Sequence, residues 1–143
     1  KNRKEKYKEE WNVALDKSAK DRSYLYGRLL AVADRIEYMT YDAKDNGRIT
    51  NAKRYMSTFS QRPFDTWLVI EQNIQPYLDK LKRDKIKQYY YYQKELDEIL
   101  NLFEVDTFRK NERLNGLYLL GFHSESYEMR KKKQNTENKD EEE

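Results

Sequence analysis

The chain has no cysteine and very little glycine or proline: its 143 residues include four glycines and two prolines. Without cysteine, a disulfide framework, a zinc-thiolate site and a cysteine nucleophile are excluded, and the absence fits a reducing compartment. Scarce glycine and proline leave few signals that would end a helix. The sequence therefore favours helices over a fold rich in turns.

Long apolar runs are missing as well. The longest are a few residues, far below the roughly 20 that a membrane-spanning helix needs, and the first residues are charged where a secretion signal would be apolar. We therefore expect a cytoplasmic protein with no membrane contact. The length is that of one domain. Because the chain starts at Lys1 and not at methionine, we expect a piece of a longer product or a missing beginning.

Residues for catalysis and metal binding are sparse. His123 is the sole histidine, and no G-x-S-x-G turn supplies a serine nucleophile beside it. Glu95, Asp97 and Glu98 are close in sequence, but they do not converge on one cation when the segment is helical. The glycine motifs that bind phosphates are absent. The sequence predicts a protein that is not an enzyme and holds no metal or cofactor.

Charged residues are abundant in the chain. Charged residues make up 38% of the composition, hydrophobic residues 37%, and the mean hydropathy is -1.22, so we expect partners to contribute to its order. The net charge is +3, but residues 136–143 hold one lysine and five acids, which leaves +7 on residues 1–135. A basic body favours an anionic partner, above all nucleic acid, and is also compatible with an ordinary solvated helical surface.

Apolar residues recur with the helical period along the chain, and no segment alternates as a strand would. We predict an all-α fold, a compact helical bundle of about five or six helices. The helices are expected near residues 4–17, 21–43, 51–59, 63–74, 83–103 and 107–122. The bundle domain covers residues 1–130, and residues 131–143 are predicted to be a disordered charged tail.

Local signals mark several helix ends. Asp45-Asn46-Gly47 is a turn signal, and Thr50 or Asn51 can cap the helix that follows it. Pro76 predicts a kink or restart, and Thr107 can cap the last helix. Gly121, within that last helix, permits another helix to approach closely because it has no side chain.

Two groups of basic residues lie outside the tail. Arg28 and Arg35 are seven residues apart on one helical face, and a segment between Arg48 and Arg62 adds further cations and polar or aromatic residues. Its members are Lys53, Arg54, Asn51, Tyr55, Ser57, Ser60 and Gln61. This mixture suits phosphate contacts and base stacking on a single strand, and equally suits a capped surface helix.

The second group has five cations within residues 80–87 and precedes four consecutive tyrosines, Tyr89–Tyr92. Four successive positions point around most of a helix, so some of these rings must be exposed. Exposed rings can stack on bases or cover another subunit. We favour a contact with another subunit.

The most distinctive segment is Tyr24–Glu37, which reads YLYGRLLAVADRIE and places an apolar stripe on one side of a helix. Three motifs follow it in order: Thr50-Asn51-Ala52, Arg54-Tyr55-Met56-Ser57 with Ser60 and Pro63, and NGLYLLGF at residues 115–122. Over roughly residues 20–130 the chain resembles the C-terminal part of the large subunit of type I-C CRISPR effector complexes. In that family the same segment is also made separately as the small subunit. Pro76 departs from the pattern, because the family continues a helix there.

The resemblance implies a non-catalytic helical subunit that helps to hold the DNA strand displaced when a guide RNA pairs with its target. Base pairing recognises the sequence, and lysines and arginines lower the cost of exposing a polyanionic strand. The residues that we expect to contact DNA are Arg28, Arg48, Asn51, Lys53, Arg54 and Arg62.

The partners implied are the backbone and large subunits of the complex, the guide RNA with its target DNA, the non-target single strand and, as a further option, another copy of the chain. The alternative is a purely structural helical module that contacts neighbouring proteins without touching nucleic acid. It is suggested by the 13 tyrosines and the alternating charge. Binding of single-stranded DNA separates the two interpretations.

Overall fold

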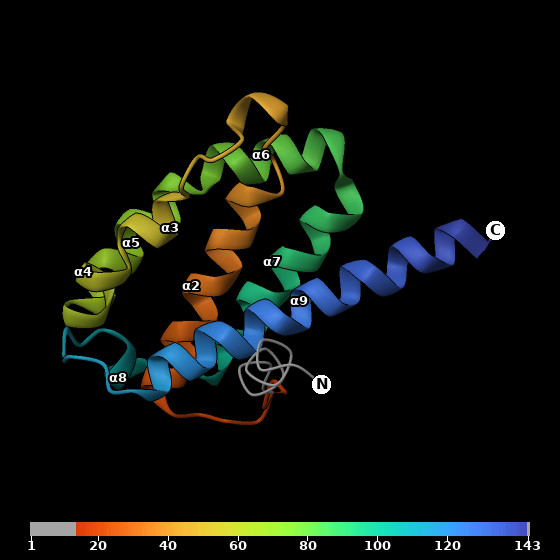
Figure 1. The fold of residues 1–143 in the computed structure, drawn as a ribbon. Coiled ribbons are helices and arrows are strands. Elements are labelled where there is room, and N and C mark those ends of the chain that lie inside the picture. Colours follow the sequence, from red (N-terminus) through yellow and green to blue (C-terminus); the bar gives the residue numbers. More distant parts are fainter. Residues whose placement is uncertain (1–13, 143) are drawn as a thin grey trace, which may run out of the picture.

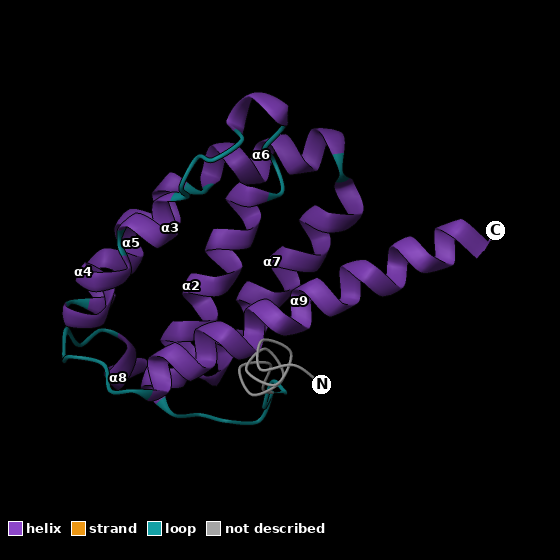
Figure 2. Ribbon diagram, viewed as in Figure 1, coloured by secondary structure: helices purple, strands orange, loops and turns teal. Residues whose placement is uncertain are grey.

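The computed structural model describes residues 14–142, with side-chain surroundings for residues 14–132, and these residues form helices joined by loops without a strand (Figure 2). The all-α prediction is confirmed. The elements are α2 (Arg22–Tyr38), the short 3-10 helix η1 (Ala43–Asp45), α3 (Asn51–Arg54), α4 (Met56–Gln61), α5 (Pro63–Asn73), α6 (Gln75–Asp84), α7 (Ile86–Leu102), α8 (Val105–Phe108) and α9 (Leu117–Glu142).

Several predicted helix ends are confirmed and others are corrected. α5 ends at Asn73 and α6 begins at Gln75, so Pro76 starts a new helix where its missing N–H costs nothing. Thr107 lies inside α8 and caps nothing, because α9 begins ten residues later. Of the first predicted helix, residues 14–17 are coil and turn, and the remainder lies outside the described residues.

α2 is the central helix of the fold, with α3, α5, α6, α7 and α9 packed around it (Figure 1). The predicted apolar stripe is buried, but Tyr26, Leu30 and Ala31 on its other sides are buried too. Over residues 23–33 the helix is buried on all sides and has no solvent face, while its last turns are partly exposed. Its polar residues must therefore find partners inside the protein.

The closest helix contact is the crossing of α2 and α9. A Cβ atom on Gly27 would collide with the backbone carbonyl of Tyr118, and one on Gly121 with the backbone carbonyl of Tyr24. Each of these two glycines faces the other helix, so the two backbones can touch. The close approach predicted at Gly121 is confirmed, and Gly27 supplies its counterpart.

The long connection between α8 and α9 is held against the start of α2. Arg22 donates from Nε to the carbonyl of Thr107 at 2.8 Å and from Nη1 to that of Glu112 at 3.0 Å. Tyr26 donates its hydroxyl to the Phe108 carbonyl, and its ring packs on Phe59, Phe103 and Phe108. These contacts fix the loop that delivers α9 to its crossing with α2.

The last turns of α9 extend past the other helices (Figure 1). The helix continues to Glu142, over residues that the sequence assigns to a disordered tail, and the domain boundary at residue 130 stays a prediction. Among the described residues, no helix is long and apolar enough to cross a membrane.

Candidate nucleic-acid interface

The predicted basic segment begins where α3 is attached to α2. Thr50 caps α3: its hydroxyl oxygen accepts from the Lys53 N–H at 3.3 Å, and the hydroxyl donates to Asp34 of α2. The buried carboxylate of Glu37, also on α2, accepts from the Asn51 N–H at 2.9 Å. Negative groups at a helix start satisfy free N–H groups and interact favourably with the positive end of the helix dipole. α2 therefore orients the helix that carries Lys53 and Arg54.

Lys53 and Arg54 are exposed on α3, and no ion pair among residues 14–132 involves either of them. Arg48 and Arg62 are exposed as well, each beside one acid: Arg48 lies 3.5 Å from Asp45 and Arg62 lies 2.6 Å from Asp65. Exposed pairs of this kind are weak and exchange readily with another anion. All four cations are accessible to phosphate groups.

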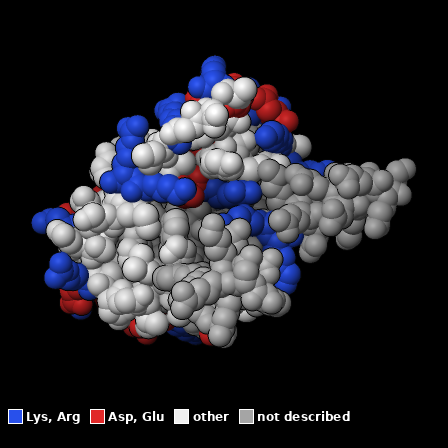
Figure 3. Space-filling model, in the orientation of Figure 1, with Lys and Arg blue, Asp and Glu red and all other residues white. Residues whose placement is uncertain are grey.

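α3, α4 and α5 pack against one another, so the elements that carry or adjoin Lys53, Arg54 and Arg62 lie together. In Figure 3, lysine and arginine atoms form a band that starts in the region of α3 and crosses the middle of the face, interrupted by acidic atoms. Asn51 is half-buried and uses its backbone N–H on Glu37. It anchors the cationic helix at its start.

Arg28 corrects the predicted set of DNA contacts. Its side chain is 1% exposed, and its Nε lies 3.2 Å from Oε1 of Glu125 on α9. No phosphate can reach a guanidinium enclosed between α2 and α9. The helical spacing places Arg28 and Arg35 on one face, as predicted, but that face is covered by neighbouring helices.

The surroundings of Arg28 form a buried polar cluster between α2, α7 and α9. Glu95 of α7 and Glu125 are both buried, and the cluster leaves Arg28 Nη1, Glu95 Oε2 and Glu125 Oε2 without hydrogen-bond partners among the described residues. Burial, together with the nearby Glu95 carboxylate, raises the pKa of Glu125 to about 8, although Arg28 opposes this shift. Glu125 therefore holds a proton near neutral pH, although Arg28 contacts it.

The second basic group is partly used inside the protein. Lys80 donates to the Thr40 carbonyl at 3.1 Å and Lys85 to the Met39 carbonyl at 3.0 Å, where α2 ends. Cations at a helix C-terminus satisfy free carbonyls and favour the dipole. Tyr92 is buried while Tyr90 is 61% exposed, so the tyrosine run has an inward and an outward side as predicted.

Three residues that shape the interface were missed by sequence reasoning. Glu37 holds Asn51 and also accepts from the Tyr41 hydroxyl, and Tyr77 of α6 lies 3.4 Å from Nη2 of Arg48 through its hydroxyl. Burial raises the pKa of Tyr41, and the hydrogen bond to Glu37 raises it further. In the sequence, only Glu37 hinted at these contacts, because it is an acid directly beside an apolar position of the stripe.

The acidic side chains and His123 are the residues that metal binding or catalysis would use. In the part of the chain that the structure describes, no cluster of three or more histidine, aspartate or glutamate side chains could hold a metal ion. His123 is half-buried on α9, and burial lowers its pKa. The described surface offers positive charge and aromatic rings.

The comparison with known protein families identifies the family of the chain. A family model described as CRISPR-associated protein (Cas_Csd1) matches residues 1–130, which is most of the chain. No curated protein matches the chain. The family resemblance drawn from the sequence motifs is confirmed.

Proposed function

Because the chain belongs to the Cas_Csd1 family of CRISPR-associated proteins, we propose that it is a non-catalytic subunit of a type I-C guide-RNA complex. In this role it holds the displaced non-target DNA strand and bridges the neighbouring backbone and large subunits. The observation that carries the proposal is the accessibility of Arg48, Lys53, Arg54 and Arg62 on adjoining elements that α2 holds in place.

The physical role of these cations is electrostatic. Exchange of a DNA duplex for a guide–target duplex is nearly balanced in free energy, so modest attraction for the released strand shifts it toward the open state. Each lysine or arginine that neutralises a phosphate releases condensed counterions, which favours binding at low salt. No covalent step is required for this function.

Exposed apolar residues support the bridging part of the proposal. Leu68 and Val69 on α5 and Leu117, Leu119 and Leu120 on α9 are exposed in the isolated chain. Apolar side chains on a helical surface are typical of contacts with other proteins. The same observation favours the second candidate function, a structural module that joins subunits without touching nucleic acid.

The test is a change of charge with a matched control. Arg48, Lys53, Arg54 and Arg62 are replaced by alanine in one variant, and the control removes four exposed cations of α6 and α7, Lys82, Arg83, Lys87 and Lys94. Binding of single-stranded DNA is measured over a range of salt concentrations, and helicity is checked by circular dichroism.

If all four predicted cations contact phosphates, the slope of log affinity against log salt falls by about 3 in the first variant, from about 0.7 for each contact. The control variant keeps a steeper slope because its cations lie outside the proposed interface. Equal slopes in both variants contradict the assigned interface. A wild-type chain that binds no single strand, alone or in the assembled complex, favours the structural module.

A further inference from the structure

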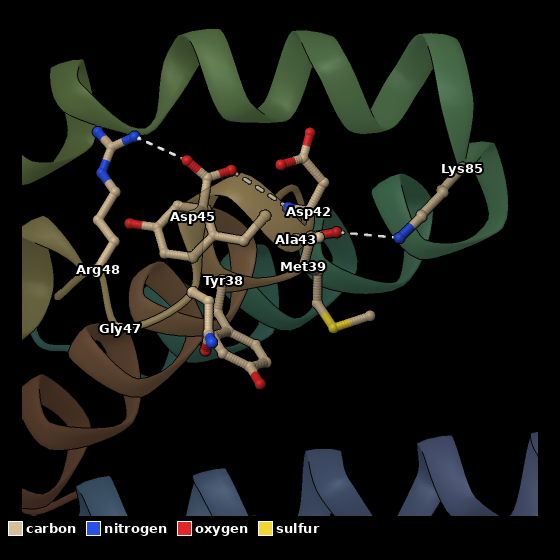
Figure 4. A pocket seen from close by; sticks show the side chains of 10 residues that line it. Tyr38, Met39, Asp42, Ala43, Asp45, Gly47, Arg48 and Lys85 are labelled. Carbon is tan, nitrogen blue, oxygen red and sulfur yellow. Dashed lines mark hydrogen bonds and ion pairs between the residues drawn. The ribbon is translucent and has the colours of Figure 1, made fainter.

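A cavity of about 420 Å³ lies between the end of α2, the loop that contains η1, and the start of α7, with Arg48 in its wall (Figure 4). Pockets that bind small organic groups are typically about 300 to 1,000 Å³. Two tyrosines, Tyr38 and Tyr41, and two cations, Arg48 and Lys85, line it. The cavity therefore combines aromatic surface with two cations, and two acids, Asp42 and Asp45, also line it.

Of the two tyrosine rings in this cavity, the ring of Tyr38 is the one accessible for stacking. It is 51% exposed, and the Arg35 guanidinium lies 5.3 Å from its ring centroid, which supports the ring from within the protein. Tyr41 lies beside it, with ring centroids 6.1 Å apart and planes tilted by 56°. Tyr41 is held in place by its bond to Glu37 and by Arg48 at 5.3 Å from its ring. One fixed ring and one exposed ring form an angled aromatic surface.

The two cations stand on opposite sides of this surface. Figure 4 shows Arg48 at one end, Lys85 at the other, and η1 between them. Arg48 is oriented by Asp45 at 3.5 Å and by the Tyr77 hydroxyl at 3.4 Å, and Lys85 is oriented by the Met39 carbonyl at 3.0 Å. A cation on each side of an aromatic surface suits a base flanked by two phosphates.

The acids of the cavity wall are engaged in holding the loop. Asp45 uses Oδ1 on Arg48 and accepts the Asp42 N–H on Oδ2 at 3.2 Å, while Asp42 accepts the Lys44 N–H at 3.1 Å. This reciprocal cap fixes η1. Gly47, with φ at 83°, makes the turn that brings Arg48 to the cavity.

From this arrangement we infer that the cavity binds one base of a single-stranded nucleic acid by stacking on Tyr38, with the flanking phosphates on Arg48 and Lys85. The inference rests on the proposed function and deepens it. Arg48 lines the cavity and is two residues before the Thr50 cap of α3, so a short stretch of chain joins the cavity to the helix that carries Lys53 and Arg54.

The experiment compares two single strands of equal length and charge: oligothymidylate, and a strand in which every nucleotide is abasic. Both are labelled and titrated with the full chain in fluorescence anisotropy. Tyr38→Ala removes the stacking ring, Tyr38→Phe keeps it, and Tyr90→Ala is a matched control on α7, where the ring is exposed outside the cavity.

The wild-type chain and Tyr38→Phe are expected to prefer the strand with bases by about 5- to 150-fold, as stacking on one ring provides. Tyr38→Ala loses this preference and keeps its affinity for the abasic strand, while Tyr90→Ala keeps the preference. Equal affinity of the wild-type chain for both strands overturns the inference but leaves the proposed function standing. Binding of neither strand overturns both.

A second measurement does not depend on how the variants fold. Bromodeoxyuridine strands crosslink to nearby aromatic side chains under ultraviolet light, and the modified peptide is identified by mass spectrometry. The inference expects crosslinks in the wild-type chain on the segment that contains Tyr38 and Tyr41. Crosslinks confined to Tyr89–Tyr92 overturn it.

Discussion

Arg28 and Arg54 belong to the same predicted set of DNA contacts, yet one is enclosed between α2 and α9 and the other is exposed on α3. Arg28 lies on a long helix that five other helices surround. Arg54 lies on a helix of four residues that is attached at one end. The comparison teaches that the position of an element in the fold decides whether a cation binds a partner or stabilises the interior.

The two regions also differ in what holds them together. At the α2–α9 junction, backbones touch and a buried hydrogen bond from Arg28 to Glu125 connects the helices, so small changes of volume or polarity have large effects. Around α3, a few hydrogen bonds from α2 fix the start of a solvated helix. We therefore expect mutations at the junction to affect stability and mutations around α3 to affect binding.

The largest effect is expected from Gly27→Val. Even the Cβ of this side chain collides with the backbone carbonyl of Tyr118, which cannot move without displacing α9. We expect the free energy of unfolding to fall by about 4 kcal/mol or more, beyond the ordinary cost of overpacking. Urea denaturation measures it. Gly116→Ala is the control, because a Cβ there meets nothing within 4 Å, and an equal loss in both variants contradicts the close crossing.

The next effect separates the two arginines. Arg28→Ala leaves the buried Glu125 carboxyl group without its hydrogen-bond partner, which costs about 1 to 3 kcal/mol of unfolding free energy. Arg54→Ala, on the surface, changes the unfolding free energy by about 0.5 kcal/mol or less and weakens DNA binding instead. Urea denaturation of both variants measures the loss of stability, and DNA titration measures the loss of affinity. A DNA-binding loss in Arg28→Ala at full stability would argue against the buried pair.

Much of the fold could be predicted because the relevant signals are local. Pro76, the Thr50 cap and the stripe from Leu25 to Met39 each reflect the chemistry of a few adjacent residues. The apolar period also shows which side of α2 is buried. It does not show that the opposite side is buried too, because Tyr26 and Ala31 are compatible with either environment.

The candidate site could be predicted only in part for the same reason. Lys53 and Arg54 follow a visible cap and stay exposed, whereas the burial of Arg28 depends on Glu125, which is 97 residues away in sequence. The cavity at Arg48 likewise depends on Lys85 meeting the end of α2. Contacts between distant segments leave no periodic trace in the sequence.

The buried cluster also predicts how stability depends on pH. The folded pKa of Glu125, about 8, lies above its ordinary value of 4.5, so between these values the folded state binds more protons than the unfolded state. Stability is therefore expected to fall as pH rises through this window, by up to about 1.4 kcal/mol for each pH unit. Urea denaturation across the window measures the slope.

Glu125→Gln is the control for this pH dependence, because it resembles the protonated acid and removes its titration. The groups that face Glu125 are Glu95 and Tyr91 on α7 and Arg28 on α2, and they remain in the variant. His123, with its lowered pKa, costs stability in acid, which is the opposite direction. A variant that keeps the wild-type slope shows that another group causes it.

The smallest effect concerns the attachment of α3. Thr50→Ala removes the cap of this helix and its bond to Asp34, which costs about 1 kcal/mol. Because Glu37 still holds the Asn51 N–H, α3 is expected to fray without unfolding the bundle. Hydrogen exchange at Lys53 and Arg54 should quicken while amides of α2 stay protected, and DNA affinity should fall less than in the variant that lacks four cations. Thr50→Ser, which keeps the hydroxyl, should behave like the wild-type chain. If Thr50→Ala instead weakens α2 and α3 equally, then the cationic helix is part of the core, and the contrast between the two regions is smaller than their burial indicates.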